Sequence, residues 1–254
     1  MERLKNRVAI VTGGARGIGQ AYCLALAREG ARVAVADILD TTDTVSKVKE
    51  LGTEAIGVNV DVRSFESAKR MADAAAKAFG KIDILVNNAA LYGGLKMQSY
   101  NEISEEEWDR LMAINVKGVW QCTKAVAPFM VEQKYGKVIN ISSGTIFLGT
   151  PGLLHYVVSK GAVWAMSRCL SRELGGYGIR VNGITPGFTM SQASRDIMAA
   201  SHAEGLEKII AAQAALGREQ QPADLVGTVV FLASEDSDFM TGQNLNVDGG
   251  VVHW

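Results

Sequence analysis

The stretch TGGARGIG, from Thr12 to Gly19, decides the fold of this chain. It follows a short apolar run, Val8 to Thr12, and precedes a helix-like segment, Gln20 to Glu29. Glycines let the backbone turn sharply and approach a phosphate, and the free N–H groups and dipole of a helix start favour negative charge. A strand, a glycine-rich turn and a helix in this order predict a dinucleotide site. The loop residues expected to contact the dinucleotide are Gly13, Arg16, Gly17, Ile18 and Gly19.

The same alternation of strand-like and helix-like runs continues along the chain, which is typical of parallel βαβ units. The strand-like runs are short and rich in Val and Ile, as expected for strands covered on both faces. Strands are predicted at residues 8–12, 32–37, 55–59, 82–87, 137–142, 180–185 and 244–247, and helices at 64–79, 104–130 and 156–174 among others. The sequence therefore predicts an α/β fold, a doubly wound (Rossmann) parallel sheet of about seven strands with helices on both faces.

The length of 254 residues fits one dinucleotide-binding and catalytic domain, residues 1–254, because α/β folds of this size commonly share one core. Residues 188–217 differ from the rest of the chain. They are rich in Ala, Met and Ser, have no strand pattern and directly follow Pro186 and Gly187. We expect them to form a small helical lid over the substrate.

Charge and cysteine content argue against several classes of protein. The 26 Lys and Arg against 27 Asp and Glu give a net charge of -1, which provides no basic surface for nucleic acid or an anionic membrane. No apolar run approaches the roughly 20 residues that span a bilayer, so we expect a cytoplasmic protein. The three cysteines are scattered and lack metal or redox spacing, so no metal is expected.

Asp37 ends the second predicted strand, 18 residues after Gly19. A carboxylate at this position accepts hydrogen bonds from the adenosine ribose hydroxyls and repels a 2′-phosphate. Ile38 supplies no cation, and the one argument for NADP is Arg16, which can equally pair with Asp37 or lie in solvent. We therefore expect NAD as the cofactor, with NADP less favoured.

Tyr156 and Lys160 are one turn apart at the start of a predicted helix, so their side chains share a face. Such a pair is common in sequences, and this chain has a second one, Tyr92 and Lys96, in a glycine-rich loop without a rigid helix. The first pair is distinguished by Ser143, which follows a predicted strand thirteen residues before Tyr156. The presence of Ser143 therefore makes Tyr156 and Lys160, and not Tyr92 and Lys96, the candidate acid/base pair.

With these motifs in place, the chain resembles the short-chain dehydrogenase/reductase family in its single-domain subgroup. The resemblance runs from Arg7 to Gly250 and rests on the glycine loop, Asp61-Val62, Asn87-Asn88-Ala89, Asn115, Ser143, Tyr156, Lys160, Pro186-Gly187, Thr241-Gly242-Gln243 and Asp248-Gly249-Gly250. It implies that Asp61 and Val62 hold the adenine and that Asn88 and Ala89 pass beside the adenosine ribose. It also implies that the segment with Pro186, Gly187, Thr189 and Ser191 covers the nicotinamide, and that the protein is a homotetramer.

The family likeness makes Tyr156 the acid/base of a hydride transfer at a secondary carbinol carbon. A phenol with a reference pKa of about 10 is a poor base at neutral pH unless its anion is stabilised, which Lys160 and the oxidised nicotinamide do. Lys160 is also expected to bind the nicotinamide ribose. Ser143 is expected to orient the substrate oxygen, and Asn115 to anchor a water on the proton path or, alternatively, to fix a helix kink.

The substrate walls are expected from residues 93–96, residues 145–154 and the lid after Phe188, because these segments follow strand ends beside the nicotinamide. Their side chains are mostly apolar, which favours a small, fairly hydrophobic ketone or secondary alcohol, cyclic or aromatic. Ser143, Thr145, Leu95 and Phe188 are the predicted substrate contacts. Two alternatives stay open: the apolar residues simply pack the lid, or Arg195, His202 and Arg218 reach a charged substrate group.

Three other functions fit parts of the pattern. A reductase of 3-oxoacyl thioesters, on acyl carrier protein or CoA, is expected to prefer NADP and to carry a basic docking surface, and Asp37 and the net charge argue against it. Sugar-nucleotide epimerases and dehydratases usually have a differently spaced glycine loop and a larger substrate domain. A non-catalytic dinucleotide sensor has no need to keep Asn115, Ser143, Tyr156 and Lys160 together.

Overall fold

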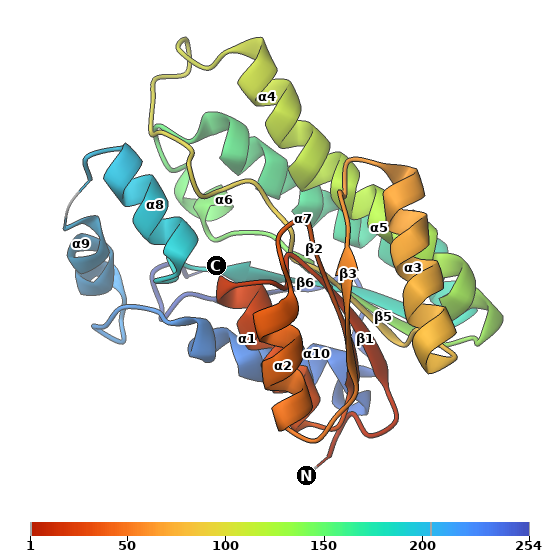
Figure 1. Ribbon diagram of the computed structural model, residues 1–254. Helices are drawn as coiled ribbons and strands as arrows, with labels where there is room; N and C mark the ends of the chain where they lie inside the picture. The colour runs from red at the N-terminus through yellow and green to blue at the C-terminus, as the bar shows by residue number, and fades with distance from the viewer. Residues whose placement is uncertain (1, 204, 254) are drawn as a thin grey trace.

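The computed structural model describes residues 2–203 and 205–253, so Met1, Glu204 and Trp254 of the predicted domain 1–254 lie outside the described residues. A parallel seven-stranded sheet in the order β3-β2-β1-β4-β5-β6-β7 forms its centre (Figure 1). The strands are β1 (Val8–Thr12), β2 (Arg32–Asp37), β3 (Ala55–Asn59), β4 (Ile84–Asn87), β5 (Gly136–Ile141), β6 (Ile179–Pro186) and β7 (Asn244–Val247). The predicted doubly wound α/β fold is confirmed.

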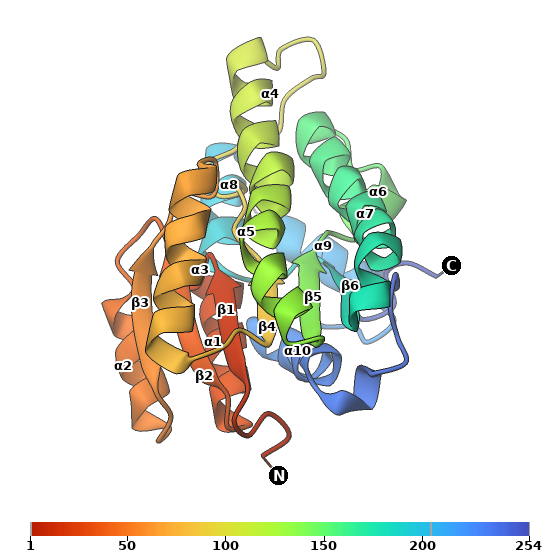
Figure 2. The same ribbon diagram turned by 90° about the vertical axis from the view of Figure 1, so that its right-hand side faces the viewer.

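The sheet is covered on both faces, which explains why its central strands are apolar throughout. Every residue of β1 and β4 is buried, and Val11 of β1 is paired with Val35 of β2 on one side and Val86 of β4 on the other. One core cluster joins the sheet to α1 (Gly17–Arg28), α2 (Thr42–Glu50) and α10 (Val226–Ala233). The other joins it to α3 (Phe65–Phe79), α5 (Gly118–Glu132) and α7 (Leu154–Leu174), on the opposite face (Figure 2).

The chain changes direction across the sheet between β1 and β4. From β1 it winds outward through β2 to β3, and then returns to place β4 on the other side of β1. In open α/β sheets the carboxyl ends of the strands at such a point leave a crevice for a ligand. The ends of β1, β2 and β4 therefore locate the site.

The predicted helix 104–130 begins as expected but is interrupted. The Ser104 hydroxyl caps α4 (Glu105–Met112) by accepting a hydrogen bond from the Glu107 N–H at 3.1 Å. A π-helical turn, η1 (Ala113–Lys117), then separates α4 from α5. Such a turn inserts one extra residue into a helix and is frequent at functional sites.

The segment predicted as a helical lid contains two helices, α8 (Gln192–Ala200) and α9 (Leu206–Gln213), which confirms its helical character. The remaining elements are short: α6 (Thr145–Leu148), η2 (Gly175–Tyr177), η3 (Pro222–Leu225) and η4 (Glu235–Ser237). Among the helices of the described ranges, none has the length and apolar character needed to cross a bilayer.

Candidate active site

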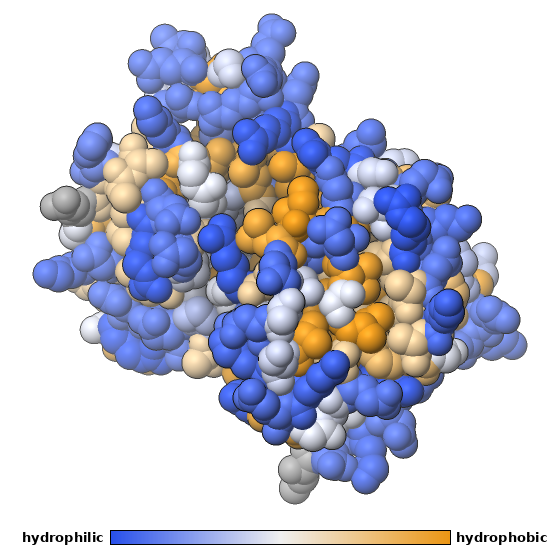
Figure 3. Space-filling model, in the orientation of Figure 1, coloured by the Kyte–Doolittle hydropathy of each residue, from blue (hydrophilic) through white to orange (hydrophobic). Residues whose placement is uncertain are grey.

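A cavity of about 970 Å³ lies at the carboxyl ends of the strands, between the glycine loop, the end of β5 and the lid helices. Apolar side chains gather in the hollow on this side of the molecule, and hydrophilic residues surround it (Figure 3). Its lining includes all the predicted cofactor residues, namely Gly13, Arg16, Gly17, Ile18, Gly19, Asp37, Asp61, Val62, Asn88, Ala89, Tyr156, Lys160, Pro186, Gly187, Thr189 and Ser191. The structure therefore brings this predicted set together around one space.

The glycine loop is packed too tightly to hold side chains. A Cβ at Gly13 would lie 2.8 Å from the Cα of Ala89, and a Cβ at Gly19 would collide with the carbonyl oxygen of Gly13. The amide of Asn88 braces this turn by donating to the carbonyl oxygens of Thr12 at 3.0 Å and Gly13 at 3.1 Å. The backbone is thus held open for a ligand that approaches it directly.

The start of α1 is left free for an anion. Arg16 is the N-cap of α1 and provides no side-chain hydrogen bond, so the first N–H groups of the helix lack a cap. A helix start of this kind favours negative charge. The exposed Arg16 guanidinium has no hydrogen bond or ion pair within the described ranges, so it lies in solvent and does not pair with Asp37.

Asp37 is held at the end of β2 with its carboxylate toward the glycine loop. Its two oxygens accept backbone N–H groups, Oδ2 from Ala15 at 2.9 Å and Oδ1 from Leu39 at 3.0 Å. Each carboxylate oxygen keeps a further lone pair for a hydroxyl donor. Asp61, by contrast, is occupied by Arg63, whose guanidinium lies 2.7 Å away and holds the pKa of that carboxyl below its usual range. Its carboxylate is therefore not a free acceptor.

Ser143, Tyr156 and Lys160 meet at the other end of the cavity, where β5 ends and α7 begins. The Lys160 ammonium donates to the carbonyl oxygen of Ile141 at 2.8 Å and lies 5.7 Å from the centre of the Tyr156 ring. Burial raises the pKa of Tyr156, the neighbouring Tyr92 raises it further, and a hydrogen bond with Ser143 lowers it. Burial also lowers the pKa of Lys160, to about 8, so this lysine keeps its charge at neutral pH.

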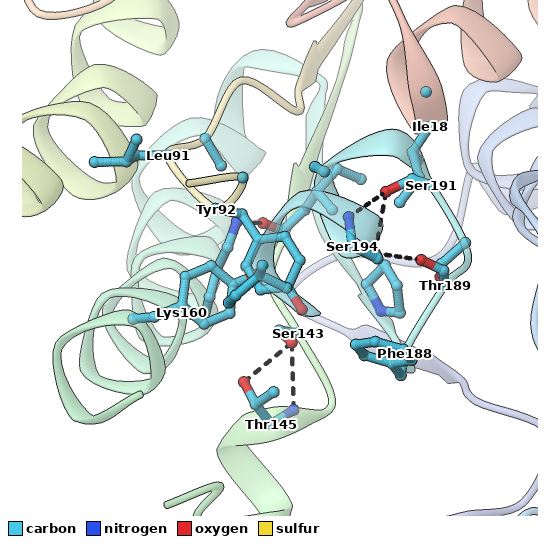
Figure 4. Close-up of a pocket in the computed structure, with 18 of the residues that line it drawn as sticks. Ile18, Leu91, Tyr92, Ser143, Thr145, Lys160, Phe188, Thr189, Ser191 and Ser194 are labelled. Carbon is cyan, nitrogen blue, oxygen red and sulfur yellow. Dashed lines mark hydrogen bonds between the residues drawn. The ribbon is translucent and has the colours of Figure 1, made fainter. Parts of the chain in front are cut away.

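The Ser143 hydroxyl is oriented by Thr145. Its oxygen accepts hydrogen bonds from the Thr145 hydroxyl at 3.0 Å and the Thr145 N–H at 3.3 Å, both drawn in Figure 4. Because both bonds use the oxygen of Ser143 as acceptor, its proton stays available for another oxygen. The pair therefore presents a hydroxyl donor to the cavity beside Tyr156.

Asn115 lies in the π-helical turn and does not line the cavity. Its Oδ1 accepts the Leu91 N–H at 2.7 Å, and its Nδ2 donates to the carbonyl oxygen of Leu91 at 3.2 Å and to the Ser159 hydroxyl at 3.1 Å. Asn115 thus ties the loop after β4 to α7, and its water-anchoring role stays a prediction.

The predicted substrate contacts divide into two groups. Ser143, Thr145 and Phe188 line the cavity, as Figure 4 shows for its labelled residues, whereas Leu95 does not. Leu95 is buried behind the wall in a cluster with Leu111, Leu153, Tyr156 and Ile197. The placement of Leu95 in the wall was wrong, because its side chain turns into the packing beneath the loop. Arg195, His202 and Arg218 are also absent from the lining, and Arg218 is paired with Asp224 at 2.7 Å.

Sequence reasoning missed several lining residues. Tyr92 was set aside as half of a chance motif, yet its ring lies 4.9 Å from that of Tyr156. An aromatic residue in the loop that follows the carboxyl end of a central strand was the signal that could have indicated it. Arg110 of α4 is a second lining residue outside the predicted wall segments. Within the predicted lid, α9 contributes Leu206, Ile209, Ile210 and Gln213. A metal site is not formed here: the described part of the chain has no cluster of three or more His, Cys, Asp or Glu suited to one.

Comparisons with known proteins agree with this geometry. The family model described as enoyl-(acyl carrier protein) reductase matches residues 13–252. An uncharacterized oxidoreductase of Mycobacterium tuberculosis is 44% identical over 249 residues, covering 97% of this chain and 98% of that protein. The 3-oxoacyl-(acyl-carrier-protein) reductase of Thermotoga maritima is 34% identical over 255 residues, covering 98% and 99%. The crystal structure of levodione reductase matches with a TM-score of 0.92 at 28% identity, covering 97% of each chain. The chain belongs to the short-chain dehydrogenase/reductase family of oxidoreductases.

Proposed function

We propose that the protein is an NAD-dependent alcohol dehydrogenase or carbonyl reductase, in which Tyr156 is the acid/base. The observation that carries this proposal is the meeting of Tyr156, Lys160 and Ser143 at one end of a cavity whose other end has an uncapped helix start and the Asp37 carboxylate, which can still accept a hydroxyl donor. When bound, a nicotinamide dinucleotide supplies or accepts the hydride. The glycine loop, Asp37 and Lys160 are suited to hold it.

Each polar residue at the reacting end has a distinct role in this proposal. The Ser143 and Tyr156 hydroxyls hold the substrate oxygen, and Tyr156 gives its proton to that oxygen in reduction or takes it in oxidation. Burial makes the phenolate form of Tyr156 unfavourable, so the positive charge of Lys160 is needed to lower the free energy of ionising Tyr156. Asn115 does not line the cavity; its side chain holds the loop after β4 and helix α7 in place.

The preference for NAD rests on Asp37. Its carboxylate is fixed by two backbone N–H groups and cannot turn away from a 2′-phosphate without losing both bonds. The unpaired Arg16 guanidinium is the observation that favours NADP, and with the likeness to 3-oxoacyl-(acyl-carrier-protein) reductase it supports the second candidate function, reduction of a 3-oxoacyl thioester. We rank the second candidate lower because the Arg16 side chain is exposed and unpaired, whereas the Asp37 carboxylate is fixed by two backbone N–H groups.

The proposed substrate is small, uncharged and fairly hydrophobic, with a cyclic or aromatic body. The reacting end is walled by apolar side chains, among them Leu153, Phe188 and Met198. A buried substrate carboxylate requires a cationic or hydrogen-bonding partner. The cations that line the cavity within the described ranges are Arg16 on the glycine loop, Arg63 after β3, Arg110 on α4, and Lys160. Of these, Lys160 is the one at the reacting end, and it is already assigned to Tyr156 and the cofactor. An uncharged substrate therefore fits this end of the cavity best. The homotetramer and the cytoplasmic location stay predictions.

The test follows absorbance of the reduced cofactor while secondary alcohols, cyclic diols and matching ketones are offered with NAD or NADP. The proposal expects turnover that prefers NAD and is abolished in Tyr156→Phe, a variant that keeps the ring and loses the hydroxyl. Tyr177→Phe, a change on the half-exposed η2, is the matched control and should leave the rate unchanged. Turnover with NADP and acyl thioesters alone would favour the second candidate.

A further inference from the structure

The loop after β4 places a second phenol beside Tyr156. Tyr92 lines the cavity, and its ring centroid lies 4.9 Å from that of Tyr156 with the planes tilted by 42°. This spacing is that of an interacting aromatic pair. Both rings therefore border the same end of the cavity.

Tyr92 is held in this position from two sides. The residue before it, Leu91, has both its backbone N–H and its carbonyl oxygen bonded to the Asn115 amide. The residue after it, Gly93, packs against α8 so closely that a Cβ there would lie 3.2 Å from the Cα of Ala193. Figure 4 draws Tyr92 among the residues that line the pocket. Its ring is a fixed part of the wall.

The Tyr92 hydroxyl has no hydrogen-bond partner among the residues that the structure describes. Burial raises its pKa to about 12, so it stays a neutral hydroxyl, able to donate a proton to a hydrogen bond, across the physiological range. Lys96, the other half of the second motif, is exposed and does not line the cavity. The Tyr92 side chain is only partly buried, so its hydroxyl is within reach of solvent in the cavity and can donate to a ligand oxygen there.

We propose that Tyr92 is a specificity-determining residue that binds a second oxygen of the substrate, next to the reacting carbon. This inference rests on the proposed function, since Tyr156 and Ser143 are assigned to the reacting oxygen. The substrate class it defines is a hydrophobic vicinal diol, an α-hydroxyketone or a 1,2-diketone. A site that hydrogen-bonds a particular oxygen discriminates against the analogue lacking it.

Binding to the protein loaded with NADH tests this inference without turnover, because an alcohol cannot react with reduced cofactor. Calorimetry would compare trans-1,2-cyclohexanediol with cyclohexanol in the wild type, in Tyr92→Phe and in Tyr100→Phe, an exposed control in the same connection. One net hydrogen bond corresponds to roughly 5- to 10-fold in affinity. We expect the wild type and the control to prefer the diol by about this factor, and Tyr92→Phe to lose the preference while keeping its affinity for cyclohexanol.

The inference is overturned if the wild type shows no preference for the diol, if neither ligand binds, or if the preference survives in Tyr92→Phe. Failure of the proposed function has a different signature, since it appears as turnover that is unaffected by Tyr156→Phe or as no turnover with any alcohol or ketone. If the wild type and Tyr92→Phe both oxidise cyclohexanol and the diol equally well, the proposed function stands and the specificity role of Tyr92 is refuted.

Discussion

Replacing Asp37 with asparagine removes one negative charge from the cofactor end of the cavity with almost no change of shape. The wild-type carboxylate accepts the N–H groups of Ala15 and Leu39, one on each oxygen. The amide of Asp37→Asn accepts one of them and turns its NH₂ toward the other. We therefore expect the free energy of unfolding to fall by about 1–3 kcal/mol, the cost of a buried donor left without an acceptor.

The effect on cofactor choice follows from the charge. Two unit charges about 4 Å apart interact by about 4 kcal/mol at an effective dielectric constant of about 20. Water at the cavity mouth screens part of this energy, and half of it, about 2 kcal/mol, corresponds to roughly 30-fold in affinity. The ratio of NADP to NAD affinity should therefore rise by roughly 30-fold in Asp37→Asn, aided by the free guanidinium of Arg16.

Calorimetric titration of each variant with both cofactors measures this ratio, which is insensitive to a loss of stability common to the two titrations. Arg16→Gln provides the matched control. When combined with Asp37→Asn, the Arg16→Gln change should remove most of the increase in NADP affinity. In the wild type, Arg16→Gln should change the affinity for NAD little. A ratio that stays within about twofold of the wild type, or a wild type that already prefers NADP, would refute the assignment of Asp37.

Three further changes test the rest of the site. Lys160→Met should shift the rise of kcat/KM with pH, set by Tyr156, upward by about one unit or more, because the cation is lost. The difference between the two enzymes should narrow as the pH rises past about 8, since burial lowers the pKa of Lys160 to about 8 and the wild type loses this cation as the pH rises through that value. Thr145→Val should lower kcat/KM roughly 5-fold by removing one hydrogen bond, while steady-state assays of Thr145→Ser show the wild-type rate. Gly19→Ala should abolish dinucleotide binding, measured by cofactor fluorescence, whereas Gly227→Ala, in open space on α10, should preserve it.

The strands could be predicted because buried parallel strands are short and apolar, and the bounds of β1, β2, β3 and β7 agree with the pattern. The predicted strand 82–87 starts later, at Ile84. The reason is Asp83, whose side chain accepts the Val8 N–H at 2.8 Å before the strand pairing begins. A side chain that replaces a backbone acceptor leaves no trace in the apolar pattern.

Contacts between distant residues account for what the sequence did not predict. The π-helical turn in the segment 104–130 keeps the apolar spacing of a helix, and the partners of Asn115, namely Leu91 and Ser159, are far away in the chain. In the loop after β4 the sequence placed Leu95 in the wall and overlooked Tyr92. Side-chain direction in an irregular loop has no period from which it can be predicted.

The tie made by Asn115 has a consequence for how such a protein acquires new substrates. Its side-chain amide bonds only to backbone atoms of Leu91, so these two bonds do not depend on which side chain stands at position 91 or 92. The identity of residue 92 can therefore change during evolution, or in a mutant library, while the loop keeps its place beside α7. Diversity concentrated at this position should alter selectivity at little cost in folding.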